Sequence, residues 1–257
     1  QCIKELGNIN FDRRKRVAFF CDLKALAITR VDLAIKKVAK KPLKTIDGEL
    51  VVKDGCKTVK ISRKTGLLES YIVNGKELLA GETFEPIISE ATPNPWGHFL
   101  NRIDKDSESI KLSNCNKGVF NGYKNVRVTE CGEILTRIES LFENENSSIR
   151  LSYIIPKDLP YIDVEADVFW NEQNKSLRLK VPISGNGKIK TQTAFSINEV
   201  ERDGRDWPNG RFTAIQEDDM ALAIYNDGVF DCLAEKNDLY LMLLNGFQIL
   251  IKQKLTN

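Results

Sequence analysis

The stretch Tyr161-Ile-Asp-Val-Glu-Ala-Asp-Val-Phe-Trp170 alternates apolar and acidic residues. Its even-numbered positions from 162 to 168 are apolar, and Asp163, Glu165 and Asp167 lie between them. A period of two predicts a β-strand with one buried face. Carboxylates on the other face are typical of a solvated surface, because an acid–base pair needs facing carboxylates in a shielded site.

Further short strands are expected on both sides of this stretch. From residue 49 onward, turn residues separate short apolar runs, and Asn74-Gly75 is a strong hairpin signal. Strands are expected at 120–128, 133–142, 148–155, 177–182, 211–216, 220–225 and 239–244. No helical period of comparable strength occurs after residue 49. Many short strands at near-regular spacing predict an all-β sandwich or barrel.

The first 42 residues are ambiguous. Leu23, Ala27 and Val31 recur at helical spacing, whereas residues 31–36 also alternate as in a strand. The lysine-rich stretch 36–44, which contains Pro42, is typical of a solvated boundary. We therefore place a small element or linker at 1–42 and the main β region at 43–257.

Composition narrows the class of protein. The 257 residues include 38 basic and 36 acidic side chains, a net charge of +2, which gives no global field to attract nucleic acid or an anionic membrane. No stretch approaches the roughly 20 apolar residues that span a bilayer. The chain opens with Gln1 and no signal segment follows, which predicts a part of a longer protein. We expect no nucleic-acid or membrane partner.

Six cysteines lie far apart, without a C-x-x-C pair. A chain of this length can build a core without disulfides, so we expect reduced, mostly buried thiols. This cysteine usage predicts a cytoplasmic protein.

Few residues are candidates for chemistry. His98 is the only histidine, in a proline-bracketed loop with Trp96, so a histidine-based zinc site or catalytic triad would have to include it. It is either an ordinary loop side chain or a polar contact at the rim of a ligand cleft. Glu217-Asp218-Asp219 is more typical of an acidic turn than of a metal site. We expect no metal bound by this chain.

The segment Arg202–Phe212 combines three arginines with Trp207. Guanidinium donors and an apolar ring are suited to recognition of a polyol. The alternative is a turn whose arginines pair with nearby aspartates.

Three parts of the chain occur in a familiar order. The segment Val59-Lys-Ile-Ser-Arg-Lys-Thr-Gly-Leu-Leu-Glu-Ser70 comes first, and Val164-Glu-Ala-Asp-Val-Phe-Trp-Asn-Glu-Gln-Asn-Lys-Ser-Leu-Arg-Leu-Lys-Val-Pro182 follows. Strands at 210–215, 220–228 and 239–244 come last. Together they resemble the C-terminal β region of the family 38 glycoside hydrolases, the α-mannosidases, over about residues 43–244.

The resemblance implies a large antiparallel supersandwich of the galactose-mutarotase-like type, with a small N-terminal β element. In that family a retaining mechanism uses an Asp nucleophile, a second carboxylate and a zinc ion, all in an N-terminal catalytic domain. None of those motifs occurs here. The resemblance therefore implies a domain that is catalytically inactive alone, with zinc and the catalytic residues in the catalytic domain of the same parent chain.

The resemblance also implies a role in binding a mannose-containing carbohydrate. The arginine that opens the Arg-(Leu/Phe)-Thr strand contributes to the sugar cleft in the family, and Arg211 occupies that position. Trp96 and His98 align loosely with an aromatic loop of the family, and Trp207 joins them as a substrate-binding candidate. One departure is that the family's L-L-R-S-P segment is replaced by Leu244-Asn245-Gly-Phe247.

Two other functions stay open. A free-standing carbohydrate-binding module could use Trp96, Trp207 and the 202–211 segment as its platform. A mutarotase-like sugar epimerase would need a general acid and base across a cleft, commonly His with Glu, and a single histidine makes this the weaker alternative.

Overall fold

The computed structural model describes residues 18–32, 34, 43, 45–46, 48–91, 107–183, 187–217 and 220–245. Regular structure in these ranges is β, apart from one 3-10 turn, η2 (Gly118–Phe120). The strands form four sheets, and neighbouring strands in each sheet run antiparallel. The prediction of an all-β antiparallel fold is confirmed.

Two of the sheets are meanders of consecutive strands. The first has the order β1 to β5, namely β1 (Thr45–Ile46), β2 (Glu49–Lys53), β3 (Lys57–Ile61), β4 (Leu68–Val73) and β5 (Lys76–Glu77). The second has the order β11-β10-β9-β8. Its strands are β8 (Val126–Cys131), β9 (Leu135–Glu143), β10 (Ser148–Pro156) and β11 (Asp163–Phe169).

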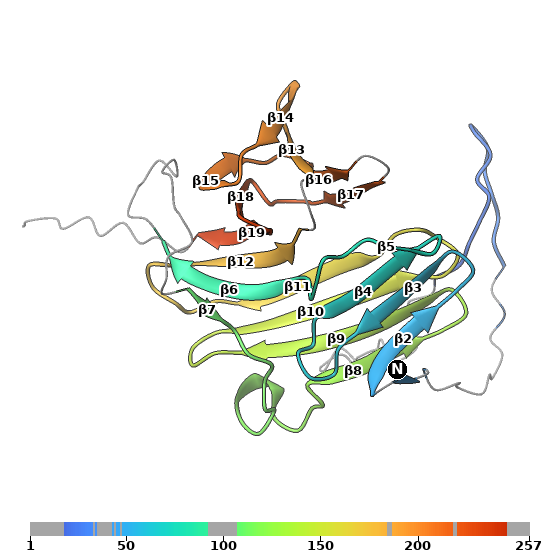
Figure 1. Cartoon of the computed structure of the whole chain (residues 1–257). Coiled ribbons are helices and arrows are strands. Elements are labelled where there is room, and N and C mark those ends of the chain that lie inside the picture. Colours follow the sequence, from blue (N-terminus) through green and yellow to red (C-terminus); the bar gives the residue numbers. More distant parts are fainter. Residues whose placement is uncertain are drawn as a thin grey trace, which may run out of the picture.

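The other two sheets combine distant strands. The six-stranded sheet has the order β15-β18-β19-β12-β6-β7, with β6 (Glu85–Glu90), β7 (Glu108–Ser109), β12 (Lys175–Pro182), β15 (Asp203–Pro208), β18 (Asp231–Glu235) and β19 (Asp238–Asn245). The small sheet has the order β14-β13-β16-β17, with β13 (Lys188–Thr193), β14 (Ser196–Val200), β16 (Phe212–Glu217) and β17 (Met220–Tyr225). Figure 1 shows the small sheet at the top of the molecule, away from the two meanders.

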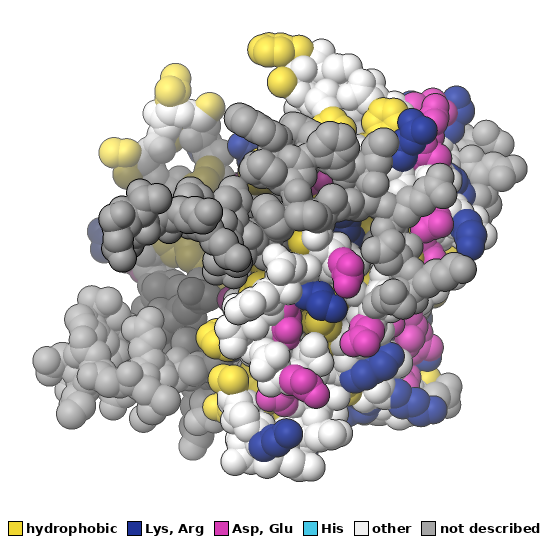
Figure 2. Space-filling view, turned by 90° about the vertical axis from the view of Figure 1, so that its left-hand side faces the viewer, with side chains coloured by type: hydrophobic (Ala, Val, Ile, Leu, Met, Phe, Trp, Pro, Cys, Tyr) yellow, Lys and Arg dark blue, Asp and Glu magenta, His cyan; other side chains and the backbone are white. Residues whose placement is uncertain are grey.

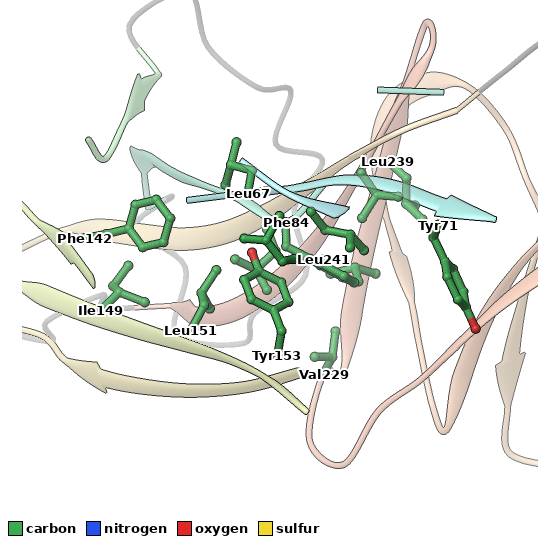
Figure 3. Close-up of a cluster of buried hydrophobic side chains, with 14 of the residues drawn as sticks. Leu67, Tyr71, Phe84, Phe142, Ile149, Leu151, Tyr153, Val229, Leu239 and Leu241 are labelled. Atoms are coloured by element: carbon green, nitrogen blue, oxygen red, sulfur yellow. The ribbon is translucent and has the colours of Figure 1, made fainter. Parts of the chain in front are cut away.

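One hydrophobic core joins the meanders to the six-stranded sheet. Leu151 and Tyr153 of β10 lie opposite Leu239 and Leu241 of β19, as Figure 3 shows. The Tyr153 hydroxyl, which is fully buried, donates to the carbonyl oxygen of Gly66 at 3.1 Å. Burial of this many aliphatic and aromatic side chains is the main stabilising contribution to the fold.

A buried lysine fastens the first meander to the second. Lys57 Nζ donates to Asp54 Oδ2 at 2.8 Å, to the carbonyl of Leu159 at 2.7 Å and to that of Pro156. Burial alone would raise the pKa of Asp54, but hydrogen bonds from Lys57 and Cys56 outweigh it and hold the pKa well below its usual range. All three ammonium protons thus have acceptors.

The strand predicted from the alternating stretch is β11. Its three carboxylates are exposed; Glu165 pairs with Arg137 at 2.8 Å and Asp167 with Arg150 at 2.6 Å. The interpretation of a solvated face is confirmed. The strand expected at 120–128 begins only at Val126, because η2 and the turn after it occupy the preceding residues.

The segment 18–32 forms neither helix nor strand, and its side chains are exposed. No strand of the small β element expected in the first 42 residues lies in this segment, since a strand needs a hydrogen-bonded neighbour and the described residues supply none, and the element itself stays a prediction. Apart from Ala34, the rest of 1–42 lies outside the described residues. The domain boundary at residue 42 stays a prediction.

Five cysteines are described, all as free thiols. Cys115 and Cys232 are buried, whereas Cys21 and Cys131 are exposed and Cys56 is half-buried. The expectation of mostly buried thiols is wrong in this respect. Among the described residues, no helical segment has the length and hydrophobicity that crossing a membrane requires.

Candidate functional site

A short crossover connects the six-stranded sheet to the small sheet and carries Arg211. Gly210 N donates to the carbonyl of Gln192 at 2.6 Å, and Arg211 N donates to Gln192 Oε1 at 2.8 Å. A Cβ on Gly210 would lie 2.8 Å from that carbonyl oxygen, so the close approach requires glycine. These contacts fix the backbone from which the Arg211 side chain extends.

The Arg211 guanidinium faces solvent. Its side chain is 77% exposed, and Nη1 lies 3.6 Å from Oδ1 of the fully exposed Asp227. An exposed pair at this separation is weak, so the guanidinium donors stay accessible to a ligand. The planar donor fork and the carboxylate could together bind several hydroxyl groups.

An aromatic pair lies at the same end of the small sheet. Phe212 of β16 faces Tyr225 of β17, with ring centroids 5.9 Å apart and planes tilted by 52°. The Tyr225 side chain is exposed. We define Arg211, Asp227, Gln192, Phe212 and Tyr225 as the crossover patch. It therefore combines hydrogen-bond donors, a carboxylate and an exposed ring, groups suited to polar hydroxyls and to an apolar face of a ligand.

The other sequence candidates do not join this patch. Trp207 pairs with Cys232 across β15 and β18 and packs against the hydrophobic core, and its Nε1 is buried without a hydrogen-bond partner. A stacking surface for a sugar needs an exposed ring, so the position of Trp207 does not favour that role. Trp96 and His98 lie outside the described residues, and their roles stay predictions.

A buried ionic cluster lies beside the start of the crossover. Arg178 of β12 is 1% exposed, and its Nη1 lies 2.9 Å from Oδ1 of Asp206 on β15. Asp206 and Asp231 lie on the paired strands β15 and β18, where Asp231 is opposite Pro208, two residues along from Asp206. Burial, reinforced by the neighbouring charge of Asp206, raises the pKa of Asp231 to about 8, and Arg178 offsets only part of this.

The ionic cluster was not predicted from the sequence. Arg178 follows the alternation Leu177-Arg-Leu-Lys180, which predicts an outward-facing side chain. Leu177 and Leu179 do enter the core, but the opposite face of β12 is also covered at Arg178. No signal in the sequence indicates this cover, because the neighbours of β12 in its sheet, β19 and β6, lie far from it along the chain.

Comparison with known proteins assigns the chain to a family. The sequence profile of the Glycosyl hydrolases family 38 C-terminal domain matches residues 52–248. The chain belongs to this family. No curated protein sequence matches the chain.

A solved structure agrees in fold. The family 38 domain is similar to a family 38 glycosyl hydrolase from Enterococcus faecalis, with a TM-score of 0.60, 9% identity and coverage of 77% of this chain. It spans 26% of the length of that protein. A putative aldose 1-epimerase from Escherichia coli K12 (TM-score 0.42, 10% identity, 76% of this chain and 86% of that one) also matches. A galactose mutarotase related enzyme from Lactobacillus acidophilus matches as well, with a TM-score of 0.41 and 7% identity over 76% of this chain and 84% of that one.

A metal centre needs several ligand side chains that converge on one point. In the described ranges, no three His, Cys, Asp or Glu side chains are grouped so as to hold a metal ion. The buried carboxyl pair has a guanidinium beside it, and a positive charge there competes with a cation. The described residues of the family 38 domain therefore do not fit the zinc site that the resemblance implies for the catalytic domain.

Proposed function

We propose that this family 38 domain supports the catalytic domain of an α-mannosidase-like glycoside hydrolase and forms one wall of its sugar cleft. In this proposal Arg211 donates to a hydroxyl group of a mannose-containing carbohydrate in the cytoplasm. The observation that carries it is the exposed guanidinium on a glycine-dependent crossover, beside Asp227 and the aromatic pair.

Rigidity of the crossover favours a binding role. A donor held on a fixed backbone loses less conformational entropy when it binds than a donor on a mobile loop. Gln192 holds Arg211 through its side-chain oxygen and Gly210 through its carbonyl, so two residues of the crossover depend on one residue of β13. We infer that this geometry presents Arg211 to a ligand, while bond cleavage is the task of another domain.

Kinetics of the full-length enzyme test this proposal. Arg211→Ala should lower kcat/KM for an aryl α-mannoside about 10- to 100-fold, as expected for one charged hydrogen bond to substrate. Arg205→Ala is the matched control, because Arg205 is also exposed and pairs with Asp203 at 3.0 Å. The family 38 domain alone should not hydrolyse the substrate, with or without zinc. Turnover by the domain alone, or an unaffected Arg211→Ala enzyme, would contradict the proposal.

A carbohydrate-binding module is the second candidate. The exposed Tyr225 ring, which lies against the half-buried Phe212 beside Arg211, favours it, since such a surface could bind a sugar without a second domain. Titration of the domain alone with mannose and mannobiose by calorimetry separates the two functions. Binding that Tyr225→Ala abolishes would establish the module, whereas no binding is expected for a cleft wall that needs its catalytic domain.

A further inference from the structure

The β13–β14 hairpin ends in a strained and exposed aromatic residue. Thr193 and Ser196 pair directly, so Ala194 and Phe195 form a two-residue turn. Phe195 has a φ of +63°, a left-handed conformation that favours Gly or Asn. Its side chain is also fully exposed, at 109%. The turn thus combines an unfavourable backbone conformation with an unburied apolar ring.

Phe84 shows how such strain is normally offset. It has a similar φ of +69°, but its ring is buried in the core, as Figure 3 shows. Packing therefore stabilises Phe84 in a conformation that its side chain disfavours. The described residues provide no such packing for Phe195, and strain without local compensation is typical of a site that contacts a partner.

The hairpin tip lies beyond the same end of the small sheet as the crossover patch. Gln192, which holds Arg211, precedes Phe195 by three residues, and a strand rises roughly 3.3 Å per residue, so the tip lies no more than about 10 Å from that contact. Figure 1 shows the β13–β14 hairpin projecting at the top of the molecule. Figure 2 shows apolar side chains standing out at the same height.

We propose that the β13–β14 hairpin is a docking finger, whose Phe195 and Ile197 enter an apolar pocket of the catalytic part of the same family 38 polypeptide. This inference rests on the proposed function, because a catalytic part that completes a cleft at Arg211 must approach within about 10 Å of the tip. The similar Enterococcus faecalis protein has most of its length outside the matched domain, which spans 26% of it.

The chemistry of the tip indicates a protein pocket rather than a sugar. Ile197 is 62% exposed next to the turn, and an aliphatic side chain gives a sugar no ring to stack on. Opposite charges on the two strands of the hairpin cancel in the ion pair Lys188–Glu199, at 3.3 Å across β13 and β14. Docking should therefore depend on apolar burial and respond little to salt.

The variant Phe195→Asn separates strain from docking. Asparagine tolerates the left-handed conformation, so the melting temperature of this chain alone should rise by about 2–4 °C. In the full-length enzyme the same variant should lose the docking contact, and cleavage between the domains in limited proteolysis should become about tenfold faster or more. Phe169→Asn is the matched control, because Phe169 is 61% exposed on β11 and has no left-handed φ.

Two outcomes would overturn the docking finger. Equal stabilisation of the chain alone and of the full-length enzyme, with unchanged proteolysis, would show a strained turn without a partner. A dimer of the chain alone that Phe195→Asn dissociates in sedimentation would assign the contact to a second copy. A different result would contradict the proposed function alone. In that case Arg211→Ala would leave kcat/KM unchanged, whereas Phe195→Asn would still accelerate proteolysis.

Discussion

Asp206 and Asp231 lie close enough across strands β15 and β18 for the charge of Asp206 to raise the pKa of Asp231, and the buried guanidinium of Arg178 lies beside Asp206. Two buried carboxylates that interact electrostatically cannot both ionise easily, so one of them retains a proton at neutral pH. This pair borders the crossover that carries Arg211. Its protonation therefore affects the stability of the sheet edge from which the crossover begins.

Asp231→Asn should flatten the pH dependence of stability. The pKa of Asp231 is raised to about 8 in the folded state, against 3.8 for an ordinary Asp, so its stabilising contribution is present below about pH 4 and is lost as the pH rises toward 8. The free energy of unfolding of the parent chain should fall over this window, and that of the variant should fall less. Urea denaturation at pH 5, 6, 7 and 8 measures this, with Glu145→Gln as an exposed control. Parallel curves for parent and variant would contradict it.

Lys57→Met should be strongly destabilising. The ammonium group is buried and bonded to Asp54 and to two carbonyls, so its removal leaves a buried carboxylate without its partner. Loss of one member of a buried pair costs about 3–5 kcal/mol. Lys60→Met is the control, because Lys60 and Glu69 form a half-exposed pair at 2.8 Å that is worth about 1 kcal/mol or less. Urea denaturation should rank the two variants in this order, and equal losses would rule out the special role of Lys57.

Gly66→Ala should cost more stability than Gly48→Ala, although both glycines have left-handed φ values of +74° and +83°. A Cβ at residue 66 would lie 2.6 Å from Leu112 Cδ1 and 3.0 Å from Ser140 Cβ, whereas residue 48 is in open space. We expect Gly48→Ala to lower the free energy of unfolding by about 1–2 kcal/mol, from backbone strain alone. Gly66→Ala should lower it by about 1–3 kcal/mol more, because the added methyl group overpacks the site. Thermal or urea unfolding checks the difference, which should be absent if the β3–β4 turn moves freely.

The thiols should react in two groups. Cys21 and Cys131 are exposed, whereas burial, with a smaller effect from Asp231, raises the pKa of the Cys232 thiol to about 12. In a Cys2→Ser background, an aromatic disulfide reagent should modify Cys21 and Cys131 quickly and Cys232 only after unfolding. Mass spectrometry of labelled peptides identifies the sites. Fast labelling of Cys232 in the folded chain would show that β18 opens locally.

Periodicity and turn chemistry predicted the strands, but not the burial of their second faces. Asn74 and Gly75 both have positive φ, as a tight turn between β4 and β5 requires, and β11 matches the alternating stretch. Arg178 was not predicted as buried, because a period of two shows that a side chain faces away from the core and does not show whether something covers that face. Trp207 was expected beside Arg211, but alternation with Asp206 along β15 directs its ring to the core.

The order of strands in the six-stranded sheet has a consequence for synthesis. Both meanders join neighbours along the chain, so each can form as soon as its own residues have left the ribosome. By contrast, β12 pairs with β6 from far earlier in the sequence and with β19, the last strand described. We expect the nascent polypeptide to carry two early hairpin assemblies, and to close its central layer only when translation of β19 is complete.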